Sequence, residues 1–164
     1  MYSNPPAYPH HVAVRNFLAS HGITYKEEEG SPSSFHFEVP AEHGVLSVGI
    51  RTIPEAGEVI MYSGLPIQLE KHQLVDAREA MSWVNTGLRR SCFELDQDRG
   101  HLLCRTTLWT GDKAPEPEAM QELIRCNLDV ANHYLPAFTN SLNDASDIRD
   151  TVVQIQYKAG LHLS

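Results

Sequence analysis

The chain has 164 residues, of which 41% are hydrophobic and 21% charged, and its formal net charge is −8. These values are typical of one soluble globular domain, and the acidic balance argues against partners that are nucleic acids or anionic membranes, because both are bound through lysine and arginine. No apolar run approaches the length of a membrane helix, and the N-terminal MYSNPPAYPHH lacks the features of a secretory signal.

The first half of the chain predicts one helix followed by three strands. Residues 1–9, rich in Pro, Tyr, Ser and Asn, are expected to form a flexible arm. Apolar residues at helical spacing, ended by Gly22, predict a helix over 10–21. The polar connection at 26–34 includes Glu27-Glu28-Glu29, which we expect to be a solvated loop. The runs SFHFEVP, VLSVGIRTI and EVIMYSGLPIQL then predict three strands of an antiparallel meander.

The next stretch predicts a helix followed by a hairpin. Apolar residues recur every three or four positions across 72–88, which is the spacing of one helix face. The runs SCFELDQ and HLLCRTTLW flank a turn at Asp98-Arg99-Gly100, so we expect them to pair as strands. One face of this hairpin would carry Phe93, Leu95, Leu102 and Cys104, and the opposite face would carry Glu94, Arg105 and Trp109.

The remainder predicts a long helix and a separate tail. An apolar series with helical spacing runs from about 116 to 142, and Pro136 inside it should kink the helix. In the tail, 144–164, VVQIQYK is a candidate strand or an arm that pairs with an exposed edge. The element order is helix, three strands, helix, two strands, helix. It predicts an α+β fold over 10–143, with a five-stranded antiparallel sheet and three helices on its apolar face.

The cysteines and histidines do not form a recognisable site. Cys92, Cys104 and Cys126 form no C-x-x-C pair, and their odd number predicts reduced thiols in the cytosol. The nine histidines include no H-x-x-x-H pair, and His10 and His11 should diverge by about 100° on a helix. Phosphate-loop, nucleophile-elbow and dinucleotide motifs are absent from the sequence. We therefore expect no catalytic residue, no metal site and no cofactor.

Five residues form the candidate partner surface. Trp109 ends a strand on the outward face, beside Arg105 and near Arg51, and an exposed tryptophan with arginine neighbours has the chemistry of an interaction hot spot. The helix at 10–21 or the tail could instead cover Trp109. Arg89 and Arg90 follow the second helix, where they would either interact with its C-terminal dipole or bind an anionic group of a partner.

Three stretches within 84–142 resemble the YbjN family. They are the helix end WVNTGLRRSCFEL, the hairpin FELDQDRGHLLCRTTL and the motif His133-Tyr134-Leu135-Pro136-Ala137-Phe138. The order of the preceding elements extends the resemblance to 10–143. It implies a fold similar to the type III secretion chaperones, often dimeric, in proteins described as candidate sensory-transduction regulators. The family has no established catalytic residues, so the resemblance implies a binding role and supplies no chemistry.

The leading hypothesis is therefore a non-enzymatic cytosolic interaction module. It would act as a homodimer and bind a protein or peptide partner on the outer sheet face or on an edge strand. One alternative is an enzyme or small-ligand binder with a pocket between sheet and helices, lined by Cys104, Arg105, His133 and Tyr134. Another is a metal or pH sensor that uses the histidines.

Overall fold

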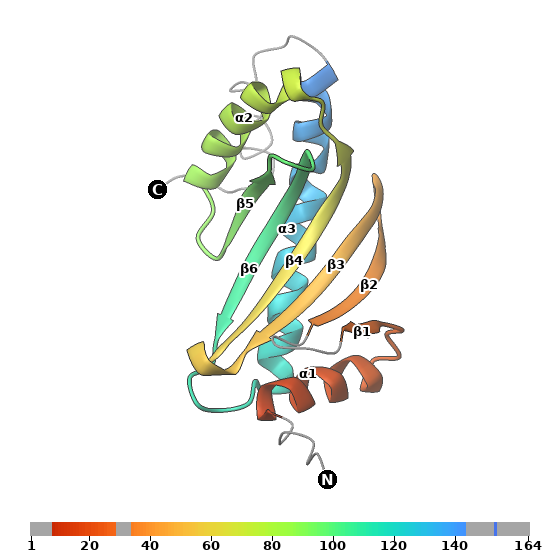
Figure 1. Ribbon diagram of the computed structural model, residues 1–164, viewed down its shortest axis with the longest axis vertical. Helices are drawn as coiled ribbons and strands as arrows, with labels where there is room; N and C mark the ends of the chain where they lie inside the picture. Colours follow the sequence, from red (N-terminus) through yellow and green to blue (C-terminus); the bar gives the residue numbers. More distant parts are fainter. Residues whose placement is uncertain (1–7, 29–33, 144–152, 154–164) are drawn as a thin grey trace.

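The computed structural model describes residues 8–28 and 34–143, together with Val153. Within them, three α-helices pack against one six-stranded antiparallel sheet (Figure 1). The helices are α1 (Pro9–Ser20), α2 (Leu74–Thr86) and α3 (Pro117–Asn143). The strands are β1 (Lys26–Glu28), β2 (Ser34–Ala41), β3 (Gly44–Ile53), β4 (Glu58–Gln68), β5 (Ser91–Asp96) and β6 (His101–Trp109). Short 3-10 turns, η1 (Pro54–Ala56) and η2 (Lys71–Gln73), precede β4 and α2.

The sheet has one strand more than predicted. Its order is β1-β2-β3-β4-β6-β5, and all strands except β1 match predicted ones. The prediction of five strands is wrong because β1 lies in the segment expected to be a solvated loop. Every residue of β1 is charged, so composition gives no strand signal. Its pairing with 34–36 of β2 is instead supported by contacts between Glu27 and α1.

The β5–β6 hairpin has the predicted register. Phe93 pairs with Cys104, and Leu95 pairs with Leu102. Phe93, Leu102 and Cys104 are buried, whereas Trp109 is exposed. The short turn and the strict alternation of side chains were sufficient to predict which residues face the core.

The core lies between the sheet and the helices. In Figure 1, α3 runs behind the sheet, where it packs against β4 and β6, while α2 packs against α3 and β5. Tyr134 and Phe138 of α3 both contact the ring of Phe93. Pro136 lies inside α3, as predicted, and the kink expected there stays a prediction.

Most of the predicted arm and tail lie outside the described residues. Of the arm, 1–9, only Tyr8 and Pro9 are described, and of the tail, 144–164, only Val153. The predicted strand VVQIQYK therefore also falls outside, apart from Val153. No helix in the described part of the chain is long and apolar enough to cross a membrane.

Candidate interaction surface

The candidate site is the face of the sheet opposite the helices, which we call the open face. Among the described residues, no helix covers it (Figure 1). Outside the register shift between Gly64 and Gln68 of β4, the strands pair residue by residue, so the outward side chains form rows that cross the sheet. One such row contains Lys26, His36, Gly49, Tyr62, Arg105 and Cys92.

A hollow of about 790 Å³ lies in the open face over β3 and β4. Ser47, Gly49 and Gly64 line its floor, where small side chains leave the backbone accessible. Its walls include Tyr62, Leu103, Lys26 and His36. A second hollow of about 430 Å³ shares Ser47, Gly64 and Leu103 with the first. Together they form one depression that is large enough to accept side chains of a partner.

Three of the five predicted residues, Arg51, Arg105 and Trp109, lie on the open face. Trp109 is 74% exposed and pairs across the ladder with Glu58, at the end of the sheet near η1. Arg51 is exposed and has no ion pair or side-chain hydrogen bond with another described residue. Arg51 pairs with Ile60, two residues along β4 from Glu58.

Arg105 is held by its neighbours on β5. Its Nε donates to Glu94 at 2.5 Å, and its Nη2 donates to Cys92 Sγ at 3.3 Å. The hydrogen bond to Glu94 is the main reason that the pKa of Arg105 is raised above its ordinary value. Arg105 is therefore already paired within the chain, unlike Arg51.

The other two predicted residues, Arg89 and Arg90, lie in the link between α2 and β5. Arg90 Nη1 lies 3.2 Å from Glu122 Oε1 of α3, which places this side chain toward the helices. Arg89 is exposed. The structure thus separates these two arginines from the predicted residues on the open face.

The structure separates two residues of the predicted internal pocket, Cys104 and Arg105. Cys104 is buried on the helix side, and this burial raises the pKa of its thiol far above the ordinary value. Arg105, the next residue of β6, faces the opposite side, and both hollows described above lie on the open face. Within residues 8–28 and 34–143, no three His, Cys, Asp or Glu side chains are grouped to hold a metal ion.

His10 and His11 diverge, as predicted, and each fixes α1 to a different part of the molecule. His10 Nε2 lies 2.7 Å from Thr110 Oγ1. His11 Nε2 lies 2.8 Å from Glu27 Oε1, and Arg15 donates to the same oxygen at 2.6 Å. The Arg15 hydrogen bond, with a smaller one from His11, lowers the pKa of Glu27. These contacts attach α1 to β1 and to the loop after β6.

Asn127 is a buried polar residue that the sequence analysis did not single out. Its Nδ2 donates to the backbone oxygens of Met61 and Cys104 at 3.2 and 3.0 Å, and its Oδ1 accepts from Ser63. It lies four residues after Leu123 and four before Ala131, on the apolar face of α3. A polar residue at this spacing was the signal that could have identified it.

Asn85 closes one edge of the sheet. Its Oδ1 accepts from the backbone nitrogen of Phe93 at 2.7 Å, and its Nδ2 donates to the backbone oxygen of Phe93 at 3.0 Å. The Asn85 side chain thus bonds the backbone N–H and C=O of Phe93, as the backbone of a neighbouring strand would. Strand β5 is therefore protected at its centre against pairing with another chain.

Comparison with known proteins identifies the fold. No protein-family model and no curated protein matches the chain. The structure is similar to YbjN from E. coli, described as a candidate transcription regulator, with a TM-score of 0.56 and 13% identity over 76% of this chain and 87% of that one. The ExsC–ExsE complex aligns with a TM-score of 0.48 and 11% identity, over 76% and 90% of the two chains. The resemblance to YbjN that was predicted from the sequence is confirmed at the level of the fold.

Proposed function

We propose that the protein is a non-enzymatic interaction module that binds a protein or peptide partner on the open face. The observation that carries this proposal is the depression over Ser47, Gly49 and Gly64, on a sheet face that no described helix covers. Contiguous exposed apolar surface beside polar residues is typical of partner-binding sites. Tyr62 and Leu103 supply the apolar wall, while Lys26 and Glu38 supply charges at its border.

The open face is a better candidate than the sheet edges. At one edge, Asn85 occupies the backbone groups of Phe93. At the other edge, β1 pairs with 34–36 of β2, and Pro40 of β2 has no N–H to donate. Strand addition would therefore have short stretches of free backbone available, whereas the open face spans several strands.

The test is to fill the depression with a large side chain. Ser47→Arg places a long cation in its floor at an exposed position, and Ser82→Arg on α2 is a matched control on another surface. Tagged wild type and both variants would be used to capture partners from the native cell, with quantitative mass spectrometry. We expect a stoichiometric partner with wild type and with Ser82→Arg, and its loss with Ser47→Arg.

Two results would reject the proposal. One is a partner that Ser47→Arg retains at the wild-type level. The other is the absence of any stoichiometric partner from the wild-type capture. Circular dichroism of all three proteins would check that the substitutions leave the fold intact.

We also propose that the protein works in the cytosol as a homodimer. Its three cysteines are free, which fits a reducing compartment. Light scattering of the purified chain should then give a mass near twice 18.4 kDa. A mass of 18.4 kDa across the working concentration range would rule out the dimer.

A further inference from the structure

We propose that Trp109 and Glu58 form a recognition point for an arginine side chain of the partner. This inference rests on the proposed function and adds the chemistry of the partner at one end of the open face. Three observations support it: the position of the indole, the charges around it, and the lack of internal partners for those charges.

The indole of Trp109 is exposed on a backbone that is held in place. A Cβ built on Gly111 would lie 3.6 Å from Cζ2 of Trp109, so the ring lies close to the backbone of Gly111. The backbone nitrogens of Thr110 and Gly111 donate to Gly57 O at 2.8 and 3.2 Å. The exposed ring therefore offers a large apolar surface beside a backbone turn that is fixed by hydrogen bonds.

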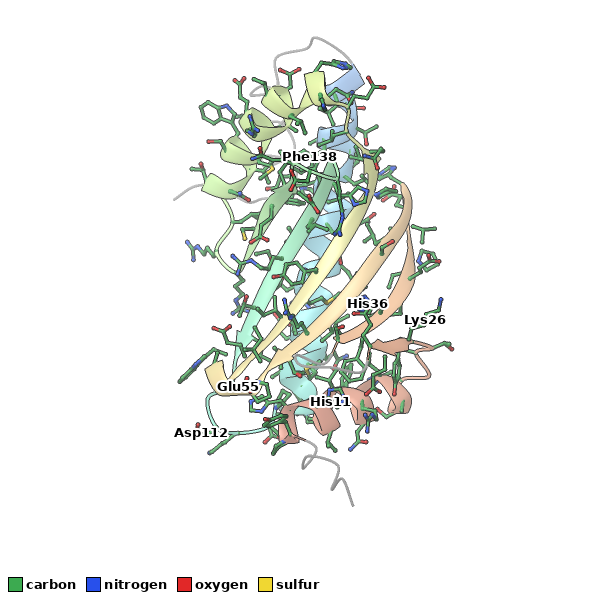
Figure 2. The ribbon with its side chains drawn as sticks, viewed as in Figure 1. His11, Lys26, His36, Glu55, Asp112 and Phe138 are labelled. Atoms are coloured by element: carbon green, nitrogen blue, oxygen red, sulfur yellow. The ribbon has the colours of Figure 1, made fainter. Side chains whose placement is uncertain are left out.

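The surroundings of this ring are acidic. Glu58 is the direct ladder partner of Trp109, so the two side chains emerge side by side on the open face. Glu55 of η1 and Asp112 lie at the same end of the molecule (Figure 2). A Cβ on Gly57 would lie 2.5 Å from Gly111 O, which shows how closely the two turns that carry these carboxylates approach.

These carboxylates are available to a partner. Glu55, Glu58 and Asp112 have no ion pair or side-chain hydrogen bond with another described residue. Lys113 follows Asp112 in the chain, and Arg51 on β3 lies diagonally across the ladder from Glu58. The three carboxylates therefore outnumber these two cations.

A guanidinium group fits this arrangement better than other side chains. It stacks on an indole face through its planar, delocalised cation, and it can donate parallel N–H bonds to a carboxylate such as Glu58. A lysine ammonium offers the charge without the planar stack, and an acidic side chain would be repelled. We therefore infer that the partner segment carries arginine where it meets Trp109.

The test uses the full chain labelled with 5-fluorotryptophan, whose fluorine spectrum contains one signal each for Trp83 and Trp109. Trp109→Phe assigns the signals. The probes are acetyl-Ala-Arg-Ala-Arg-Ala-amide and the same peptide with glutamate in place of arginine. We expect the arginine peptide to shift the Trp109 signal saturably, while the Trp83 signal on α2 stays in place and the glutamate peptide shifts neither.

Charge variants test the role of Glu58. Glu58→Gln should weaken binding of the arginine peptide about threefold, the size expected of one exposed charged contact. Glu79→Gln, at an exposed position of α2, is the matched control and should leave the affinity unchanged. The inference would be overturned by a Trp109 signal that does not shift, or by an affinity that Glu58→Gln leaves unchanged. It would also be overturned if both peptides shifted the Trp109 signal equally, or if the arginine peptide shifted both tryptophan signals equally.

A capture experiment separates this inference from the proposed function. If Trp109→Ala captures the same partner as wild type while Ser47→Arg loses it, the arginine recognition is wrong and the open face is still the binding surface. If Trp109→Ala lowers the capture and Ser47→Arg also does, both proposals are supported.

Discussion

At the scale of single residues, the interface between α3 and the sheet depends on one buried amide. Asn127 is fully buried and connects β4 and β6 through the backbone oxygens of Met61 and Cys104. An apolar side chain would fill the same space but would leave these acceptors and the Ser63 hydroxyl without their partner. The amide therefore fixes the position of α3 along the sheet, because other positions would bury it unpaired.

Asn127→Ala should destabilise the protein by about 2–4 kcal/mol, since it removes a set of buried hydrogen bonds and leaves a small cavity. Urea denaturation followed by circular dichroism measures this loss. Asn132→Ala on the same helix is the matched control, because Asn132 Oδ1 accepts one exposed hydrogen bond, from the Glu42 nitrogen at 3.2 Å. Equal losses in the two variants would contradict the account of Asn127.

Glu27 should make stability depend on pH. Its pKa is lowered in the folded protein, first by the hydrogen bond from Arg15. Its stabilisation is therefore present above the unfolded-state pKa, about 4.3, and is lost as the pH falls through the lower folded-state value. At pH 7, Glu27→Gln should be less stable than wild type by about 1 kcal/mol or less.

The measurement compares urea unfolding of wild type and Glu27→Gln at pH 7 and again below pH of about 4. The difference in free energy of unfolding between the two proteins should be smaller at the acidic pH. Glu38→Gln, which replaces an exposed carboxylate on β2, is the control for the substitution itself. A difference that stays constant with pH would argue against an ionised Glu27 in contact with α1.

The sequence predicts these residues unequally. The exposure of Trp109 follows from alternation along β6 and the turn before it, both of which are local. The roles of Glu27 and Asn127 depend on side chains distant in the chain, such as Arg15 and Ser63. Local pattern cannot identify these partners, although a polar residue on the apolar face of α3 was a usable signal for Asn127.

At the scale of elements, α2 protects the edge of the sheet through Asn85. The helix ends at Thr86, so Asn85 lies in its last turn, beside the strand that follows. Its amide bonds both backbone groups of Phe93, whose buried ring contacts the rings of Tyr134 and Phe138. The same contact thus closes the edge and positions a core aromatic residue.

Asn85→Ala should raise the hydrogen-exchange rate of the Phe93 amide about tenfold. Loss of the hydrogen bond should lower the free energy of local opening by about 1.4 kcal/mol. Exchange followed by NMR measures this rate. Thr86→Ala, which removes an exposed hydroxyl bonded within α2, is the control. An unchanged Phe93 rate would mean that Asn85 does not protect this edge.

Elements with a strong internal pattern were predicted, and those supported by distant contacts were not. The long helix and the β5–β6 hairpin carry their own periodicity and turn residues. Strand β1 carries neither, since Lys26–Glu28 is wholly charged and is stabilised by pairing with β2 and by α1. The same limit applies to the five predicted binding residues. Arg105 pairs with Glu94 and Arg90 pairs with Glu122, and these contacts depend on tertiary structure that the sequence pattern does not reveal.

At the scale of the whole molecule, the two faces of the sheet have different surroundings. One face supports α3 and the core. The other has a depression above small residues and an exposed tryptophan, with no described helix over it. The net charge of −8 and the carboxylates near Trp109 favour a partner that carries basic residues. The central claim is that this open face is the surface that binds the partner.

Site-specific photo-crosslinking in the native cell tests that claim most directly. Benzoylphenylalanine would replace Tyr62, in the wall of the depression, and in a second variant Thr86, at an exposed position of α2. The account predicts a discrete adduct with a second protein from position 62, absent from position 86 and lost when Ser47→Arg is added. Adducts of equal yield from both positions, or none from position 62, would contradict it.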